Sequence, residues 1–333
     1  MRVLPLFLLV VAVFMVLAAG CAGDGEQVVL KVVPAGSLLI PLESVEAGFE
    51  AAHPGVDVQI EGHGSIQCVR QVTDLHREVD LVAVADESLI PDMMYRPMEE
   101  GQGNYADSYT SFAANRMVIA YTDASRYADE ITPENWYEVL ARPDTVIGIS
   151  NPMLDAAGYR SLMVTTLAGD YYQDETIFSS ILGDHLRPNV TVTREGNTTT
   201  ITLPEVLKQE GGKVRIRDGS IYLLSLLDAG GVDYAFEYLS VARAHGLRYI
   251  SLPPEIDLSS ADHADNYRRV VVNLGFQRFA SIGSERVGSP IVYAATVPAN
   301  APHPALAREF MDYMVGEFGK GYDDWPDPLS GNE

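Results

Sequence analysis

Two short segments of the chain repeat one pattern, and this repeat constrains the fold more than any other feature. In VVPAGSL (32–38) and IEGHGSI (60–66), an apolar strand ends at Gly and Ser, and a helical pattern follows. A helix start capped by serine gathers free backbone N–H groups, a hydroxyl and the positive end of the helix dipole. Such a start suits an oxyanion. Because neighbouring parallel strands end at the same edge of a sheet, Ser37 and Ser65 should face one crevice.

A single Ser cap is weak evidence, because serine begins many helices for structural reasons alone. The pair is stronger, since a Gly precedes each Ser and lets a ligand approach the backbone. We therefore interpret Gly36, Ser37 and Ser65 as one side of an anion site.

The remaining pattern predicts an α/β fold with two lobes and two crossings between them. Segments with the alternating apolar pattern of strands and segments with helical periodicity follow one another along the chain, and no solenoid repeat occurs. The segment 105–114 is polar and is expected to be irregular, and 189–202 is expected to be an exposed hairpin. Strands are expected at 28–33, 56–61, 80–85, 116–121, 145–149, 213–216, 232–236 and 289–296, and helices at 38–52, 66–77, 132–140, 156–168, 220–227, 239–245 and 302–315.

The N-terminus has the composition of an export signal. Arg2 precedes the apolar run 3–17, and Ala18-Ala19-Gly20-Cys21 resembles a lipoprotein cleavage site. Residues 1–20 are thus expected to be removed and Cys21 to carry lipid, with plain secretion as the alternative. After a tether at 22–27, lobe 1 should comprise 28–118 plus 290–322, lobe 2 should comprise 119–289, and 323–333 should form a tail.

Two further features fit an exported chain. Only Cys68 remains once Cys21 is set aside, so no disulfide framework or cysteine metal site is expected, and Cys68 should be a buried small apolar residue. Asn189 and Asn197 begin glycosylation sequons.

The charge of −23 argues against nucleic acid and anionic membrane surfaces as partners. An anionic ligand would have to be held by local N–H and O–H donors, because the overall field repels it. Enzyme motifs are lacking: GHGSI (62–66) misses the second Gly of a nucleophile elbow, and no P-loop, dinucleotide fingerprint or H-x-x-x-H occurs. We therefore expect no enzyme, with an exported hydrolase using Ser65 or Ser37 as the alternative.

A third helix start lies in the second lobe, where Asp155 is expected to cap the helix 156–168. A carboxylate repels the oxygens of an anion unless it reaches the electrophilic centre, which a large metal oxyanion permits and sulfate or phosphate does not. Glu237 and Tyr238 end a strand that should reach the same crevice. Tyr238 offers an O–H donor, and Glu237 could instead form a salt bridge at the hinge.

At these residues the chain resembles the archaeal tungstate/molybdate-binding proteins of ABC importers, the WtpA/ModA-like group of solute-binding lipoproteins. The resemblance lies in V-P-A-G-S-L, G-S-I-Q-C-V-R-Q, N-P-M-L-D-A-A-G-Y-R-S, D-Y-A-F-E-Y-L-S-V-A and I-V-Y-A-A-T-V-P, which span nearly the whole mature chain in order. It implies a type II periplasmic-binding-protein fold, whose two α/β lobes are joined by two crossover strands and close on the ligand.

The resemblance also implies the ligand contacts. In the family, two carboxylates complete an expanded shell around the metal; one falls on Asp155, and the other falls where this chain has Ser220. Either Asp218 or Glu237 substitutes, or the ion stays closer to tetrahedral with Ser220 as a donor. The implied oxyanion contacts are Gly36, Ser37, Ser65, Asp155, the N–H groups of Ala156 and Ala157, and Tyr238.

The sequence therefore predicts a monomeric receptor on the extracellular face of the cell membrane, held there by lipid. It would capture tungstate or molybdate, without a cofactor, and deliver the ion to an ABC permease and its ATPase. Cavity size and Asp155 should select against sulfate. A receptor for sulfate, phosphate or another oxyanion and a receptor domain feeding a sensor are the alternatives.

Overall fold

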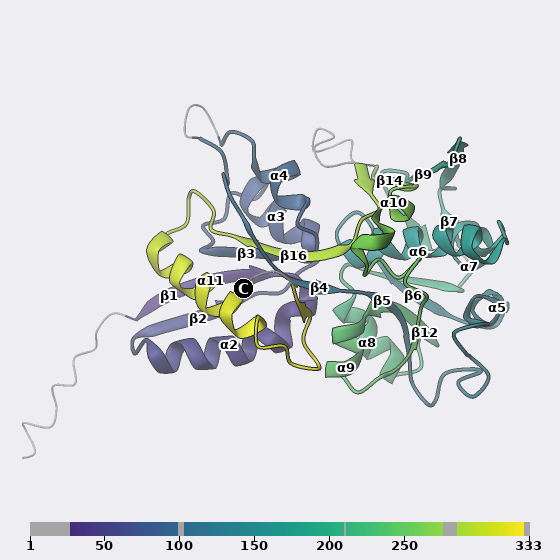
Figure 1. Cartoon of the computed structure of the whole chain (residues 1–333), viewed down its shortest axis with the longest axis horizontal. Helices are drawn as coiled ribbons and strands as arrows, with labels where there is room; N and C mark the ends of the chain where they lie inside the picture. The colour runs from purple at the N-terminus through teal and green to yellow at the C-terminus, as the bar shows by residue number, and fades with distance from the viewer. Residues whose placement is uncertain (1–26, 99–102, 210, 276–284, 330–333) are drawn as a thin grey trace, which may run out of the picture.

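The computed structural model describes residues 27–98, 103–209, 211–275 and 285–329, and shows two α/β lobes side by side (Figure 1). The predicted signal peptide, the lipidation of Cys21 and nearly all of the tether lie outside these residues. Within the described ranges, no helix has the length and apolar character needed to cross a membrane.

The first lobe contains a six-stranded sheet in the order β17-β4-β16-β3-β1-β2. Strands β1, β2 and β3 are parallel, and β16 runs antiparallel to both β3 and β4. Its strands are β1 (Val28–Pro34), β2 (Val56–Ile60), β3 (Leu81–Val84), β4 (Thr110–Asn115), β16 (Ile291–Thr296) and β17 (Asp327–Pro328). Its helices are η1 (Gly36–Leu38), α2 (Leu39–Ala52), α3 (Ser65–Thr73), α4 (Leu89–Met94) and α11 (Pro304–Phe318).

The pairing of β1 with β2 places the repeated turns next to each other. Val32 lies opposite Ile60 in the parallel register, and Ala35 forms a further parallel bridge with His63. The prediction that both Gly-Ser turns lie at one sheet edge is therefore confirmed.

The second lobe contains a five-stranded sheet in the order β11-β6-β12-β5-β13. Strand β5 follows β4 after only Arg116, so the chain enters this lobe without a loop. The strands are β5 (Met117–Tyr121), β6 (Ile147–Ser150), β11 (Val214–Arg217), β12 (Tyr234–Tyr238) and β13 (Arg248–Ser251). The helices around this sheet are α5 (Trp136–Ala141), α6 (Ala156–Tyr172), α7 (Ile177–Ile181), α8 (Ile221–Asp228) and α9 (Leu239–Ala244).

A smaller sheet, in the order β15-β14-β9-β8, lies against α6 on the outer side of this lobe. It contains the predicted hairpin, whose strands β8 and β9 are antiparallel. The remaining elements are β7 (Leu186–Arg187), β8 (Thr191–Glu195), β9 (Thr198–Thr202), β10 (Lys208–Gln209), β14 (Val270–Asn273), β15 (Glu285–Val287), α10 (Ala264–Tyr267), η2 (Gly183–His185) and η3 (Ala261–His263).

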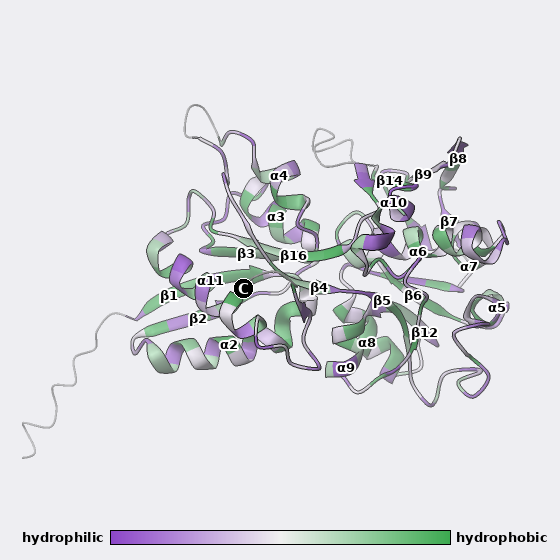
Figure 2. Ribbon diagram, viewed as in Figure 1, coloured by the Kyte–Doolittle hydropathy of each residue, from purple (hydrophilic) through white to green (hydrophobic). Residues whose placement is uncertain are grey.

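Burial follows the sequence pattern. In Figure 2, β1 and β16 are largely green, whereas α2 and α11, on the surface, mix green with purple. Helix α6 is different, because every residue from Ala156 to Gly169 is buried. A helix buried on all sides lies at the centre of its lobe. Its N-cap residue, Asp155, is therefore held in place where the second lobe meets the cleft. Cys68 is fully buried, as predicted.

Three local predictions are wrong. The segment 105–114 is not irregular throughout, because β4 begins at Thr110 and pairs with both β16 and β17. Its residues TSFAAN lack the apolar run of the central strands, which is why the pattern did not reveal it. The predicted helix 66–77 ends at Thr73. The segment expected to be a tail contributes β17 to the first sheet.

Neither serine caps its helix by its side chain. Ser37 lies inside the 3-10 turn η1, and its hydroxyl is hydrogen-bonded to Tyr293 instead. Ser65 is the first residue of α3, whose N-cap is Gly64. Asp155 is the N-cap of α6, as predicted. The residue boundaries of the lobes stay a prediction.

Candidate functional site

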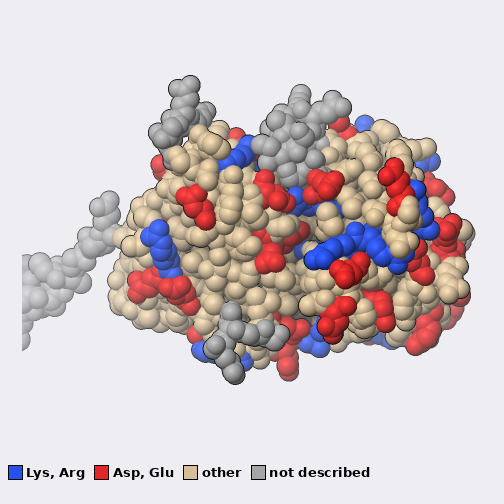
Figure 3. Space-filling model, turned by 45° about the horizontal axis from the view of Figure 1, so that its top comes forward, with Lys and Arg blue, Asp and Glu red and all other residues tan. Residues whose placement is uncertain are grey.

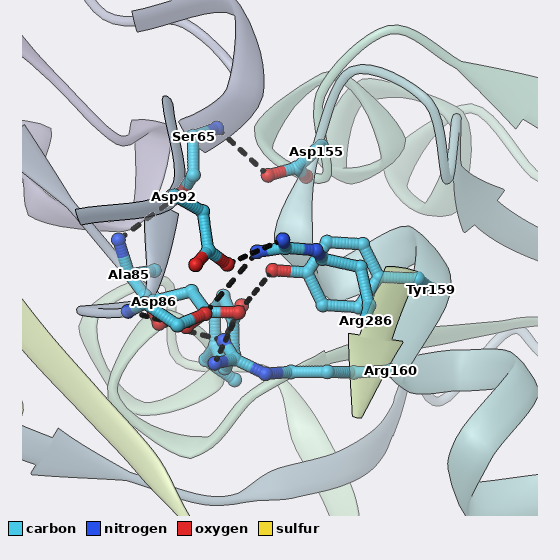
Figure 4. A network of polar contacts seen from close by, with 10 residues as sticks. Ser65, Ala85, Asp86, Asp92, Asp155, Tyr159, Arg160 and Arg286 are labelled. Atoms are coloured by element: carbon cyan, nitrogen blue, oxygen red, sulfur yellow. Dashed lines mark hydrogen bonds and ion pairs between the residues drawn. The ribbon is translucent and has the colours of Figure 1, made fainter. Parts of the chain in front are cut away.

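One carboxylate joins the two lobes at the cleft. Asp155 Oδ1 accepts a hydrogen bond from the Ser65 N–H across the cleft at 3.4 Å, and Oδ2 accepts one from the Ser220 N–H at 3.0 Å. Figure 4 shows Asp155 facing Ser65. Burial raises the pKa of Asp155, and the donated hydrogen bonds oppose that rise. The side chain is therefore a buried acceptor that connects the starts of α3 and α8.

Several backbone amides at the helix starts of the first lobe are already hydrogen-bonded in this structure. The N–H groups of Ile66 and Gln67 donate to the carbonyl oxygen of Leu154, at 3.1 and 3.2 Å. The Gly36 N–H donates to the carbonyl of His63 at 2.9 Å. An anion at the start of α3 would thus have to replace oxygens of the second lobe, and the Gly36 amide does not point free into the cleft.

The serine hydroxyls are buried next to these amides and have different partners. Ser37 Oγ lies 2.9 Å from the Tyr293 hydroxyl, and Ser65 Oγ accepts a hydrogen bond from the Ala85 N–H at 3.0 Å. Both serines are at most 6% exposed. In the part of the chain that the structure describes, neither hydroxyl is bonded to a histidine, which a serine hydrolase would need as base.

Tyr238 ends β12 and also faces the cleft. Its hydroxyl accepts a hydrogen bond from Arg160 Nη1 at 2.8 Å, and the same nitrogen donates to the Ala85 carbonyl of the first lobe at 2.7 Å. The ring centres of Tyr238 and Tyr293 are 6.1 Å apart. Tyr238 is therefore close to both Ser65, through Ala85, and Ser37, through Tyr293.

A second carboxylate, Glu237, lies beside Ser220. Its Oε1 accepts hydrogen bonds from the Ser220 hydroxyl at 3.0 Å and from the Tyr238 N–H at 2.9 Å. Its Oε2 is buried without a hydrogen-bond partner in the described residues. Of the two carboxylates that the sequence offered as substitutes at Ser220, Glu237 is thus the one in the cleft, since Asp218 is exposed.

The burial of Glu237 shifts its pKa into the neutral range. Burial raises its pKa to about 8; the Tyr238 N–H and the Ser220 hydroxyl oppose the rise, and the charge of Asp155 adds to it. The folded protein therefore binds a proton between pH 4.5 and about 8 that the unfolded chain releases.

This shift predicts a pH dependence of stability. As pH rises from about 4.5 to about 8, Glu237 should lower the free energy of unfolding by at most ~1.4 kcal/mol per pH unit. Glu237→Gln keeps the shape and should remove this component. The measurement is urea unfolding of ligand-free wild type and variant over that range; two parallel pH profiles would contradict the prediction.

Sequence reasoning missed a buried ion pair beside the site. Arg160 Nη2 lies 3.6 Å from Asp86 Oδ2, and the Tyr159 hydroxyl donates to the same oxygen (Figure 4). Burial alone would raise the pKa of Asp86, but the charges of Arg160 and Arg286 hold it below its usual value. The signal was a charged residue within the otherwise apolar helix of the N-P-M-L-D-A-A-G-Y-R-S motif.

A second arginine connects the lobes further out. Arg286 of β15 donates to Asp92 Oδ2 of α4 at 2.6 Å and to the Ser88 hydroxyl at 3.2 Å. The Arg286 side chain is 2% exposed, whereas that of Asp92 is 45% exposed. The lobes are therefore closed on each other by polar contacts that reach from the cleft to its rim.

The remaining predicted residues, Ala156 and Ala157, are the buried first residues of α6. Their N–H groups begin the helix and have no acceptor within it; the Ala156 N–H is one of the donors that lower the pKa of the Asp155 carboxyl. Within the described ranges, no group of three or more His, Cys, Asp or Glu side chains could hold a resident metal ion. Figure 3 shows acidic side chains spread over the visible face and a run of basic side chains on the second lobe. Because the net charge is −23, the overall field does not attract an anion, which would depend on local donors such as these.

Known proteins resemble the chain over most of its length. A profile of the bacterial extracellular solute-binding proteins matches residues 30–321. An uncharacterized solute-binding protein of Methanoculleus marisnigri is 44% identical over 92% of this chain and 86% of its own. The molybdate/tungstate-binding protein WtpA of Thermococcus kodakarensis is 40% identical over 96% of this chain and 89% of its own.

Solved structures share the fold. The periplasmic molybdate-binding protein of Azotobacter vinelandii superimposes with a TM-score of 0.53 at 18% identity, covering 89% of this chain and 94% of that one. The predicted type II periplasmic-binding-protein fold is therefore confirmed.

Proposed function

From the premise that the chain belongs to the extracellular solute-binding protein family, we propose that it captures tungstate or molybdate for an ABC importer. It would be a monomer, anchored to the extracellular face of the cell membrane by a lipid on Cys21, and would deliver the ion to a permease and its ATPase. Its work is binding, closure and release, without a covalent step.

The single observation that carries this proposal is the position of Asp155. A buried carboxylate stands among the starts of α3, α6 and α8, in a cleft where hydroxyl groups also gather. A compact sulfate would bring its oxygens against that carboxylate, and the repulsion between like charges would weaken binding. In a tungstate or molybdate ion the larger metal centre is electrophilic, so a carboxylate oxygen can approach it.

The neighbouring residues support the same ligand. Ser65, Tyr238 and Ser37 offer hydroxyl donors, and the amides of Ala156 and Ala157 offer N–H donors at a helix N-terminus. Glu237 is the second carboxylate that could join an expanded coordination shell around the metal of the oxyanion. One of its oxygens is buried near Ser220 and has no hydrogen-bond partner in the described residues. The relatives named for molybdate and tungstate are similar over nearly the whole chain, which supports the same cargo.

Calorimetry on the mature domain tests the proposal. We expect tight binding of tungstate and molybdate and at least about 100-fold weaker binding of sulfate, a difference of ~3 kcal/mol. Sulfate or phosphate bound as tightly as tungstate would overturn the assignment of the cargo.

Asp155→Asn tests the selectivity argument separately. The amide keeps an acceptor oxygen but loses the charge, so the ratio of tungstate to sulfate affinity should fall about tenfold or more. The ratio is the proper readout, because any competition of the side chain for the Ser65 and Ser220 amides affects both anions alike. An unchanged ratio would show that Asp155 plays no part in selectivity. Ser225→Ala, on the exposed side of α8, is the control.

A further inference from the structure

The polar contacts behind the Ser37 hydroxyl form a chain that runs from Asn115 through Tyr293. It begins at Asn115, the last residue of β4, whose Oδ1 accepts hydrogen bonds from the N–H groups of Arg116 at 2.9 Å and Ser240 at 3.5 Å. A backbone N–H can only donate, so these two contacts identify that atom as oxygen and the other as the amide nitrogen.

The amide nitrogen of Asn115 is then the donor to the hydroxyl of Tyr293. Asn115 Nδ2 donates to the Tyr293 hydroxyl at 3.1 Å and to the Ser240 hydroxyl at 2.8 Å. The Tyr293 oxygen is thereby an acceptor toward Asn115. Its other contact is Ser37 Oγ, 2.9 Å away, in which either oxygen could donate; donation by Tyr293 gives its own proton an acceptor. In that arrangement Ser37 keeps its proton for the cleft.

Two other hydroxyls of the site, those of Ser65 and Tyr238, also accept from a donor behind them, whereas the Ser220 hydroxyl donates to Glu237. Ser65 Oγ accepts from the Ala85 N–H, and the Tyr238 hydroxyl accepts from the Arg160 guanidinium. Neither donor can accept a hydrogen bond, so each hydroxyl keeps its proton for another acceptor. Ser65 and Tyr238 therefore have donors to offer to an anion, as Ser37 does when Tyr293 donates to it.

We propose that Tyr293, oriented by Asn115, is a positioning residue for oxyanion binding: it holds the Ser37 hydroxyl with its proton directed toward the ligand. This inference rests on the proposed function. It also assigns a ligand class, because a hydroxyl committed to donating suits an oxygen that is fully deprotonated, as in tungstate or molybdate near neutral pH. Tyr293 is buried in β16 and needs no contact with the ligand to act in this way.

We expect Tyr293→Phe to weaken ligand binding because the Ser37 hydroxyl would no longer be held with its proton toward the ligand. When Tyr293→Phe removes the incoming donor, Ser37 can rotate its proton toward another acceptor, and its oxygen loses a partner in a buried place. A hydrogen bond to a charged group contributes more than a neutral one, so losing its orientation should be measurable as affinity.

The experiment is a double-mutant cycle on the mature protein, read by calorimetry with sodium tungstate and sodium molybdate. Tyr293→Phe should weaken tungstate binding about tenfold in the wild-type background. In the Ser37→Ala background the same change should alter affinity less than about twofold, because no hydroxyl remains to be oriented. A general structural role of the Tyr293 hydroxyl would lower affinity equally in both backgrounds and would overturn the inference.

The control is Tyr267→Phe. Tyr267 is equally buried, donates to the Pro254 carbonyl and accepts from the Ser260 N–H, away from the cleft residues. It should leave tungstate affinity unchanged. Asn115→Asp provides a second variant should Tyr293→Phe not fold: it places an acceptor where the donor was, so Tyr293 turns its proton away from Ser37. The negative charge that Asn115→Asp adds affects affinity in both the wild-type and the Ser37→Ala backgrounds. Only the difference between the two losses of affinity therefore measures the orientation of the Ser37 hydroxyl.

The outcomes separate the two proposals. Wild type that binds neither tungstate nor molybdate overturns the proposed function, and this inference with it. Wild type that binds them while Tyr293→Phe binds equally well overturns only the positioning role of Tyr293.

Discussion

Replacing Gly64 with alanine should abolish tight binding by keeping the lobes apart. A Cβ atom at Gly64 would lie 2.4 Å from the Leu154 carbonyl oxygen and 2.8 Å from the Asp155 Cβ, both across the cleft. Gly64 has φ −65° and ψ 146°, which alanine adopts freely, so the first lobe itself should fold normally. Relief of such a backbone overlap costs ~3 kcal/mol or requires partial opening, so tungstate affinity should fall at least about 100-fold.

Two glycines provide matched controls for this result. At Gly36 an added Cβ would meet the Ile221 side chain at 3.1 Å, which can shift, so Gly36→Ala should weaken binding less. At Gly316 it would meet nothing within 4 Å, so Gly316→Ala should bind normally. Calorimetry gives the affinities, and small-angle scattering should show a more open Gly64→Ala protein. Wild-type affinity in Gly64→Ala would mean that the bound form does not bring these segments together.

The second large effect is expected at Arg160. Arg160→Met keeps the bulk of the side chain but leaves Asp86 buried without its nearest cation, and removes the donors to Ala85 and Tyr238. Breaking a buried ion pair costs ~3–5 kcal/mol when the other charge stays buried. Because Asp86 and Arg160 belong to different lobes, the protein can avoid that cost by opening and hydrating Asp86.

We therefore expect the penalty to appear mainly as lost closure rather than lost folding. Tungstate affinity of Arg160→Met should fall at least about 100-fold, with a smaller effect on thermal unfolding of the ligand-free protein. Arg268→Met is the control, because Arg268 and its partner Asp265 are both exposed and such surface pairs contribute little. Equal losses of affinity in both variants would contradict the special position of Arg160.

Local patterns predicted much of this molecule because the relevant signals were local. The β1 and β2 repeat, the apolar β3 and the long α6 each follow from the order of apolar residues, and the structure contains them all. Asp155 was identifiable as an N-cap, because that role depends only on the next few residues.

The contacts that join distant segments could not be read in this way. Nothing in the sequence relates Tyr293 to Ser37, which are 256 positions apart, or Arg286 to Asp92, 194 positions apart. Strand β4 was missed because its residues are mixed in polarity and its place is fixed by pairing on both sides. The serine caps were misassigned because tertiary partners, Tyr293 and Ala85, took the hydroxyls that local geometry would otherwise have used.

Asp155 accepts hydrogen bonds from the amides of both Ser65 and Ser220, and this bridge lowers the apparent affinity for any ligand that needs those amides. The protein carries its own competing anion, tethered within reach of the amide donors at both helix starts. A ligand that uses those donors must first displace this internal carboxylate, so its apparent dissociation constant is its intrinsic value divided by the fraction of molecules in which they are free. The same carboxylate, by returning to the amides, would speed the departure of the ion.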